Sequence, residues 1–598
     1  SELEYWIDAT NPANHELSIR VQLPCDATTE VTLFLPSWTP GSYLIRDYAR
    51  HLSRVEAFDP ATGHPLTCHK ASKNRYVVTK DDAEVIELRY RVYCHELSVR
   101  TSHVDSSHAF WNHACILLWP VDQRDLAAVI NIEQEAGSRL FCTLQSPDKQ
   151  DGEANITRLR ANDLDDAIDA PVLITSQATL STSQATADAA HTQSFQVDGV
   201  DHFIVLDGLA PIEPPPSLCD DLQAIVRQAH AVFGGELPYE QYHWLSLFTD
   251  DGYGGLEHRD SSVLLMPRTA LSTDRGYRDF LALAAHELFH AWNVKRMRPT
   301  EFWRYDYENE NYTKLLWLME GWTAYYDDLL VARAGLMSES DYLATMAKNI
   351  HNMLSAPGRF ELSLEESSFD AWVRLYKPDE NTRNSSQNYY GNGAVAAMCL
   401  DLLIRRATEG RHSIDDALRA LYQATFLAGR GYEDTDVHAA IEAIAGEGVV
   451  AQLRGLVTGA LDPQLEELLA DVGVDLTFAD AGKAFLGVSF KANTTTIASV
   501  TKGSPASIAG LAPNDEVLAA NNLRIKAGSW RSVFAAVGKV DEPMTLLVAR
   551  RGILETLDVT PTAAKGTAKL GLRAGATKAQ CAARTAWLGD ATRAVARQ

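Results

Sequence analysis

Residues 277–297 read "YRDFLALAAHELFHAWNVKRM" and contain His286, Glu287 and His290 at the spacing H-E-x-x-H. Residues four apart lie on the same face of a helix, so the two imidazoles can bind one metal ion while Glu287 lies at the adjoining edge. The alternative is an amphipathic helix that carries two histidines by chance. The rest of the chain has to distinguish the two.

A catalytic zinc ion takes three protein ligands and keeps a position for water, so a third ligand must come from elsewhere. Glu320 lies in "LLWLMEGWTAYYDD", an apolar helical stretch where an unpaired carboxylate would be costly to bury. The sequence therefore predicts one zinc ion per chain, held by His286, His290 and Glu320. Three other glutamates are rival third ligands: Glu301, Glu308 and Glu310.

Composition excludes several classes of function. The 598 residues carry a net charge of −25, which argues against a nucleic-acid partner because phosphate binding needs a concentrated basic surface. No apolar stretch approaches the ~18 to 20 residues of a membrane span. The eight cysteines are scattered without a C-x-x-C pair, so neither a disulfide framework nor a thiolate zinc site is expected.

The first residues, "SELEYWIDATNPANHELSIRVQL", alternate like a strand and lack the basic start and apolar block of a secretion signal. We therefore expect a cytoplasmic protein. The periplasm is the alternative if a signal peptide has been removed.

Periodicity along the chain predicts a multidomain α+β protein. Short alternating runs indicate a β-sandwich-like N-terminal domain, in which a loop rich in Ser, Thr, Ala and Gln is expected at 175–193. The prolines of "APIEPPPS" (210–217) favour a stiff linker, after which a small mixed sheet and then many helices are expected. The expected domains are 1–210 (β-rich), 211–335 (catalytic), 336–475 (helical), 476–565 (short strands) and 566–598 (C-terminal tail).

Further segments surround the H-E-x-x-H helix in a recognisable order. "GYGGLEH" (252–258) precedes it, while "WLMEGWTAYY" (317–326) and "YYGNGAVAAMCLDLL" (389–403) follow. This order resembles the gluzincin aminopeptidases, among them the M1 family. Because of "LPSWTPGSYLIRDYARH" (35–51) and "HAWNVKRMRP" (290–299), the chain most resembles peptidase family M61, the glycyl aminopeptidases that carry a PDZ domain.

The resemblance implies a thermolysin-like catalytic domain and assigns roles to further residues. Glu257 would bind the free α-amino group of a peptide, and Gly254 and Gly255 would let the peptide backbone pair as an added strand. Tyr390 matches the tyrosine of Y-x-x-G, whose hydroxyl would stabilise the oxyanion. Glu287 would be the general base for hydrolysis by zinc-activated water.

The predicted activity is therefore that of a zinc metallo-aminopeptidase acting on peptides with a free N-terminus. The family name implies a small first residue, Gly or Ala. The sequence departs from the M1 pattern in two ways. Glu320 lies farther beyond His290 than the third ligand does in the M1 family, and "GGLEH" ends in His258 where the corresponding M1 motif, G-x-M-E-N, ends in Asn. Two alternatives stay open: a zinc endopeptidase that docks protein C-termini, and a catalytically silent PDZ-type binding protein.

The segments "FLGVSF" (485–490) and "VTKGSPASIAGLAPNDEVLAANN" (500–522) resemble a PDZ domain. In that fold the amides of Leu486, Gly487 and Val488 would receive a peptide C-terminal carboxylate, although such domains can also act as internal props. A group of three histidines has irregular spacing for a metal site and is expected to be structural: His103, His108 and His113.

Overall fold

The computed structural model describes residues 2–25, 29–146, 155–175, 192–459 and 461–589. It divides into two compact units: the first runs to Asn311 and includes Tyr422–Tyr432, and the second comprises Tyr312–Leu421 and the chain from Glu433 onward. Most of the predicted loop at 175–193 and the last residues of the tail lie outside the described residues. Within the described residues, no disulfide joins any two of the eight cysteines.

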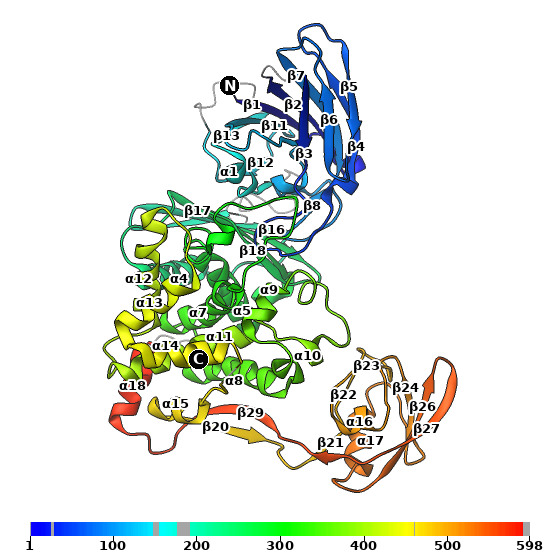
Figure 1. Ribbon diagram of the computed structural model, residues 1–598, viewed down its shortest axis with the longest axis vertical. Coiled ribbons are helices and arrows are strands. Elements are labelled where there is room, and N and C mark those ends of the chain that lie inside the picture. Colours follow the sequence, from blue (N-terminus) through cyan, green and yellow to red (C-terminus); the bar gives the residue numbers. More distant parts are fainter. Residues whose placement is uncertain (1, 26–28, 147–154, 176–191, 460, 590–598) are drawn as a thin grey trace. The chain divides into compact units, whose positions relative to one another are not determined.

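The N-terminal part of the first unit is rich in strands, as predicted (Figure 1). Its larger sheet has the order β10-β3-β6-β5-β4-β7-β2-β1-β11-β13, and a smaller one has the order β12-β14-β9-β8. The alternating burial of β2 (Glu16–Pro24) and β7 (Val85–Tyr93) places one face of each strand in the core. The bounds of the remaining strands are β1 (Leu3–Asp8), β3 (Glu30–Phe34), β4 (Leu52–Phe58), β5 (Pro65–Lys70), β6 (Arg75–Thr79), β8 (Ser102–Val104), β9 (His108–Trp111), β10 (Trp119–Pro120), β11 (Ala128–Glu133), β12 (Arg139–Phe141), β13 (Ile156–Ala161) and β14 (Val172–Thr175).

A five-stranded mixed sheet completes the first unit, in the order β15-β16-β17-β19-β18. Its strands are β15 (Thr192–Val197), β16 (Val200–Asp207), β17 (Gln241–Thr249), β18 (Gly254–Glu257) and β19 (Ser261–Pro267). The central three run parallel, and β18 turns back antiparallel to β19 as an edge strand. The segments "YHWLSLF" and "SSVLLMP" lie in β17 and β19, within the small mixed sheet that the sequence predicts. The sheet also takes in β15 and β16, which precede the proline-rich stretch.

Two helices pack with this sheet, α4 (Leu218–Phe233) and α5 (Asp274–Phe289), and they contact each other. The side chain of Thr273 caps α5 by accepting a hydrogen bond from the backbone N–H of Gly276. The N–H of the Trp244 indole donates to the carbonyl of Ala284 at 3.1 Å, which ties β17 to the middle of α5. The H-E-x-x-H segment therefore lies on a helix that is capped and anchored to the sheet.

The second unit is mainly helical, as predicted. Its longer helices are α7 (Gly321–Arg333), α8 (Glu339–Ser355), α11 (Gly391–Ala407), α12 (Ile414–Ala424), α13 (Asp434–Ala445) and α14 (Glu447–Val457). The helix α11 is buried on almost every side and contacts both α7 and α8, so it forms the centre of the bundle. Throughout the described residues, each helix is too short or too polar to cross a lipid bilayer.

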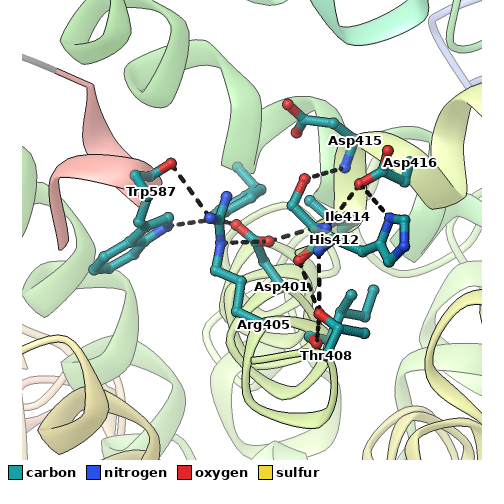
Figure 2. Close-up of polar contacts among 12 residues, drawn as sticks. Asp401, Arg405, Thr408, His412, Ile414, Asp415, Asp416 and Trp587 are labelled. Atoms are coloured by element: carbon teal, nitrogen blue, oxygen red, sulfur yellow. Dashed lines mark hydrogen bonds and ion pairs between the residues drawn. The ribbon is translucent and has the colours of Figure 1, made fainter. Parts of the chain in front are cut away.

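The chain after 566 returns to this helical bundle. Strand β29 (Thr567–Leu572) pairs antiparallel with β20 (Val474–Ala479), and α18 (Lys578–Leu588) follows. Trp587 of α18 is fully buried, and its indole N–H donates to the Tyr325 hydroxyl at 2.7 Å. That hydroxyl donates in turn to Asp401, which also pairs with Arg405 (Figure 2). The C-terminal helix is thus fastened to the bundle by a buried polar network.

Between β20 and β29 lies a small region of short strands with its own core. Its strands include β22 (Val488–Phe490), β23 (Ile497–Val500), β24 (Glu516–Ala520), β26 (Met544–Arg550) and β27 (Ile553–Val559). Two short helices accompany these strands, α16 (Pro505–Ile508) and α17 (Trp530–Val537). Apolar side chains of all these elements form one separate hydrophobic cluster.

Candidate active site

The two histidines of the motif lie side by side at the end of α5. Their ring centroids are 4.8 Å apart and the ring planes are inclined at 81°. His290 is buried, and its Nδ1 lies 2.8 Å from the carbonyl oxygen of Asn293. Because a carbonyl only accepts, Nδ1 carries the proton, so Nε2 is the unprotonated nitrogen and has the tautomeric state that a metal ligand requires.

Glu287 lies against the neighbouring edge strand, and Gly255 of β18 makes room for it. A Cβ atom built on Gly255 would lie 1.9 Å from Oε1 of Glu287, so no side chain other than hydrogen fits there. The hydroxyl of Tyr242 donates to the Glu287 carbonyl at 3.2 Å and holds this turn of the helix in place. Strand and helix therefore fix the carboxylate of the predicted base.

Glu257 ends β18 and points to the same place. One ligand atom each from Glu257, Glu287 and His290 lies within 4.8 Å of the others, and all three side chains are buried. Oε1 of Glu257 is buried without a hydrogen-bond partner among the described residues. An ionised carboxylate in such surroundings favours a cationic partner, because an unpaired buried charge is costly.

A buried ionic network lies behind Glu257. Nζ of Lys295 contacts Asp169 at 2.7 Å, and Nδ1 of His258 lies 3.2 Å from the same carboxylate. Burial would raise the pKa of Asp169, but Lys295 and His258 outweigh it and lower the pKa. Burial also opposes the charge of Lys295, yet Asp169 raises its pKa above the ordinary value. The pair is therefore charged at neutral pH beside the Glu257 carboxylate.

The second unit carries Glu320 and Tyr390. Glu320 is buried between α6 (Leu316–Met319) and α7, and the next residue, Gly321, touches α11. A Cβ atom on Gly321 would lie 2.6 Å from Cα of Gly393, so the two helices meet through glycines. Burial first and the Glu320 carboxylate second raise the pKa of Tyr390 well above its ordinary value. Its hydroxyl, which lies 3.1 Å from that of Tyr376, thus keeps its proton at neutral pH.

The three residues predicted as a carboxylate-binding loop lie where β22 begins. Leu486 is buried, Gly487 has a φ of 87°, and Val488 is the first residue of β22. The carbonyl of Gly487 accepts from Thr501 at 2.8 Å, which joins this loop to the segment before α16.

Sequence reasoning brought together the residues of α5 and β18 but missed the ionic network. Lys295 and His258 both lie inside motifs that were singled out, "HAWNVKRMRP" and "GGLEH". The available signal was a basic residue next to each of two segments that are expected to be buried, the H-E-x-x-H helix and the strand that ends at Glu257. Their acidic partner, Asp169, ends the short helix α1 (Leu164–Ile168) of the N-terminal region, and no local pattern connects it with them.

Comparison with known proteins finds two sequence profiles of the same family. A sequence profile described as M61 glycyl aminopeptidase matches residues 279–396, which contain the H-E-x-x-H helix and Tyr390. A second profile, that of the peptidase M61 N-terminal domain, matches residues 4–176. Both profiles are those of peptidase family M61, the family that the sequence resembles. The chain is a hydrolase of the metallopeptidase class, as the sequence predicts.

Solved structures similar to this chain cover between about three quarters and nearly all of it. The crystal structure of an aminopeptidase N family protein from Idiomarina loihiensis is 26% identical and covers 98% of this chain and 100% of its own, with a TM-score of 0.89. An M1 zinc metallopeptidase from Deinococcus radiodurans is 16% identical and covers 77% of this chain and 94% of its own, with a TM-score of 0.48. No curated protein matches the chain.

Proposed function

We propose that this metallopeptidase is a zinc aminopeptidase that removes a small N-terminal residue, Gly or Ala, from peptides. One observation carries the proposal: the carboxylate of Glu257 lies with that of the predicted base, Glu287, and with the imidazole of His290 at the end of an edge strand. A fixed anion at this point binds the free amino group of a peptide that begins there, and so favours an exopeptidase.

The metal would be held by His286, His290 and Glu320. The donor set suits zinc, because two imidazoles and one carboxylate are its usual catalytic ligands. The proton on Nδ1 of His290, fixed by the Asn293 carbonyl, supports this assignment because Nε2 is then the unprotonated nitrogen that a metal requires. When bound, zinc supplies a Lewis acid that polarises the scissile carbonyl and acidifies water.

The residues of the chain would then divide the proton transfers among them. Glu287 takes a proton from the attacking water as its oxygen forms a bond to the carbonyl carbon. The protonated Tyr390 hydroxyl donates a hydrogen bond to the oxyanion that develops. Glu287 passes its proton to the departing nitrogen as the C–N bond breaks. The free amino acid and the shortened peptide are the products.

Steric evidence around Glu257 supports the preference for a small first residue. Gly41, in the N-terminal "LPSWTPGSYL" segment, approaches so closely that a Cβ atom there would lie 2.4 Å from Oε2 of Glu257. The φ of Gly41 is 90°, a conformation that side-chain-bearing residues rarely adopt. This backbone would lie over the amino group and limit the space for the side chain of the first residue.

We further propose that the catalytic region is thermolysin-like and that the region from 476 to 565 is a PDZ-like domain.

The test compares a Gly- or Ala-initiated peptide with its N-acetylated form, each with and without a chelator. An aminopeptidase cleaves only the free peptide, and the chelator abolishes cleavage while added zinc restores it. Equal cleavage of the two peptides would favour the endopeptidase, and cleavage that resists the chelator would remove zinc from the proposal.

Glu287→Gln should retain zinc, measured by elemental analysis, and lose activity by about 100-fold or more.

Glu257→Ala should weaken the preference for a free amino group, measured with the same pair of free and N-acetylated peptides.

A further inference from the structure

The side chain of Arg100 lies beside β18. The Nε atom of Arg100 is buried and has no hydrogen-bond partner among the described residues. An arginine in such surroundings usually forms an ion pair with Asp or Glu, but no ion pair joins Arg100 to a described carboxylate. A half-buried guanidinium without a counter-charge is costly, so a ligand that carries an anion would find it ready to bind.

The guanidinium rests on the first residue of the edge strand. A Cβ atom built on Gly254 would lie 3.6 Å from Nη1 and 3.9 Å from Nη2 of Arg100. The preceding residue, Val99, belongs to the same apolar cluster as Leu256 of β18. This packing fixes the backbone of Arg100 next to the strand, and the side chain lies at the end of β18 opposite to Glu257.

The strand itself sets the direction in which a peptide can run. Beyond Glu257 the chain turns at once into β19, with the N–H of His258 donating to the carbonyl of Ser261 at 2.9 Å. No strand edge therefore continues past Glu257. A peptide whose amino group sits at Glu257 has to extend along β18 toward Gly254, antiparallel to the strand.

The length of the strand then selects the length of the substrate. Gly254 and Glu257 are three residues apart in the chain, which corresponds to about 10 Å in an extended strand. An extended tripeptide spans about the same distance, roughly 3.3 to 3.6 Å per residue. A peptide anchored at Glu257 would thus bring a carboxylate on its third residue to the guanidinium.

We propose that Arg100 forms a carboxylate-binding subsite, which selects peptides that carry a carboxylate on the third residue from the N-terminus. The planar fork of arginine matches a carboxylate with two parallel hydrogen bonds. The C-terminal carboxylate of a tripeptide is one source, and an acidic side chain at the third position of a longer peptide is the other. The inference rests on the proposed aminopeptidase function, because it takes Glu257 as the anchor of the amino group.

The experiment measures kcat/KM of the full-length, zinc-loaded enzyme for three pairs of peptides. Gly-Ala-Ala with a free C-terminus is compared with Gly-Ala-Ala-amide, and the pentapeptide Gly-Ala-Ala-Ala-Ala with its amide. The third pair is Gly-Ala-Glu-Ala-amide and Gly-Ala-Gln-Ala-amide, which tests the side-chain source. We expect the free tripeptide to exceed its amide by about 10- to 100-fold, as a charged hydrogen-bonded pair contributes, and the pentapeptide pair to be equal.

Variants attribute this preference to the arginine. Arg100→Ala and Arg100→Gln should abolish the difference within the tripeptide pair while kcat/KM for the amides changes little, and Arg100→Lys should restore part of it. Arg160→Ala, which removes a surface guanidinium paired with Glu2, is the matched control and should retain the full preference. Each variant is first checked for folding by its thermal transition.

The outcomes separate the two proposals. If the wild-type enzyme cleaves every free-amine peptide but shows no preference in the tripeptide or the Glu/Gln pair, the subsite is refuted and the aminopeptidase stands. A preference that survives Arg100→Gln also refutes it. If no free-amine peptide is cleaved, the proposed function fails and the subsite fails with it.

Discussion

Two neighbouring glycines of β18 face opposite sides of the strand and contact different side chains. Gly255 faces Glu287 on α5, whereas Gly254 faces Arg100. The sequence marked both as places where a peptide could pair with the backbone, and this prediction came from their lack of side chains. It could not separate the two positions, because the contact of Gly255 with α5 depends on how helix and strand pack.

Gly255→Ala should therefore inactivate the enzyme without unfolding it. The new Cβ would lie 1.9 Å from Oε1 of Glu287, so the carboxylate has to move away from its place at the end of β18. We expect kcat to fall by about 100-fold or more, the range found when a positioned acid–base group is displaced, with zinc content unchanged. Gly254→Ala is the matched control, because its Cβ meets the nearest atom at 3.6 Å, and it should cost much less. Equal losses in the two variants would contradict the assignment.

Residue patterns predict the candidate site only as far as a single segment extends. His286 and His290 followed from helical spacing, and the segment order around them supplied Glu257 and Tyr390 through a family resemblance. The link between Lys295 and Asp169 joins residues 126 positions apart. A pairing of this kind depends on the tertiary fold, which local propensity and periodicity do not encode.

At the scale of elements, the position of α18 also cannot be predicted from local sequence. Its helical character follows from the Thr577 cap and from the alanines, yet nothing in the Ala-rich tail indicates which surface it covers. The surface is formed by α7 and α11, whose residues lie far away in the sequence. Arg333 of α7 and Arg405 of α11 donate to the last carbonyls of α18, at Trp587 and Ala586. These donors satisfy the helix end that would otherwise be left unpaired.

Trp587→Ala should detach this helix and destabilise the second unit. The substitution removes a fully buried indole and leaves Tyr325 without its donor, so we expect the free energy of unfolding to fall by about 3 to 5 kcal/mol. Trp587→Phe keeps most of the apolar volume and loses the N–H, and about 1 to 2 kcal/mol is expected. Urea unfolding followed by far-UV circular dichroism measures both. A loss below about 1 kcal/mol for the alanine variant would mean that α18 is not held by Trp587.

At the scale of the whole molecule, the two units differ in their buried histidines. Four in the first unit have pKa values lowered to about 4, mainly because burial disfavours the charged ring: His103, His113, His202 and His243. His108 is the exception, because its ion pair with Asp207 outweighs burial and raises its pKa. Among the described histidines of the second unit, His351 has a lowered pKa, and its ring is only half-buried. The first unit is therefore the more sensitive to acid.

The sign of this dependence follows from proton uptake. In the unfolded chain the four rings bind protons near pH 6.5, whereas in the folded unit they stay neutral down to about pH 4. The unfolded state thus holds more protons between these values, so the stabilisation is complete above about pH 6.5 and is lost as the pH falls toward 4. We expect the first unit to lose at least about 3 kcal/mol across this window, and the second unit to lose less.

Two buried cysteines allow each unit to be followed separately, Cys115 in the first and Cys399 in the second. Their labelling by a disulfide reagent that reacts in mild acid is measured in moderate urea by mass spectrometry, with each rate divided by that of the fully unfolded chain at the same pH. Labelling of Cys115 should accelerate more than that of Cys399 as the pH is lowered from about 7 to about 4.5. His243→Gln removes one titrating ring and should reduce the acceleration at Cys115 alone, which ties the effect to the buried histidines. Parallel acceleration at both cysteines, or an acceleration at Cys399 that begins at a higher pH than that at Cys115, would show that acid acts through other groups.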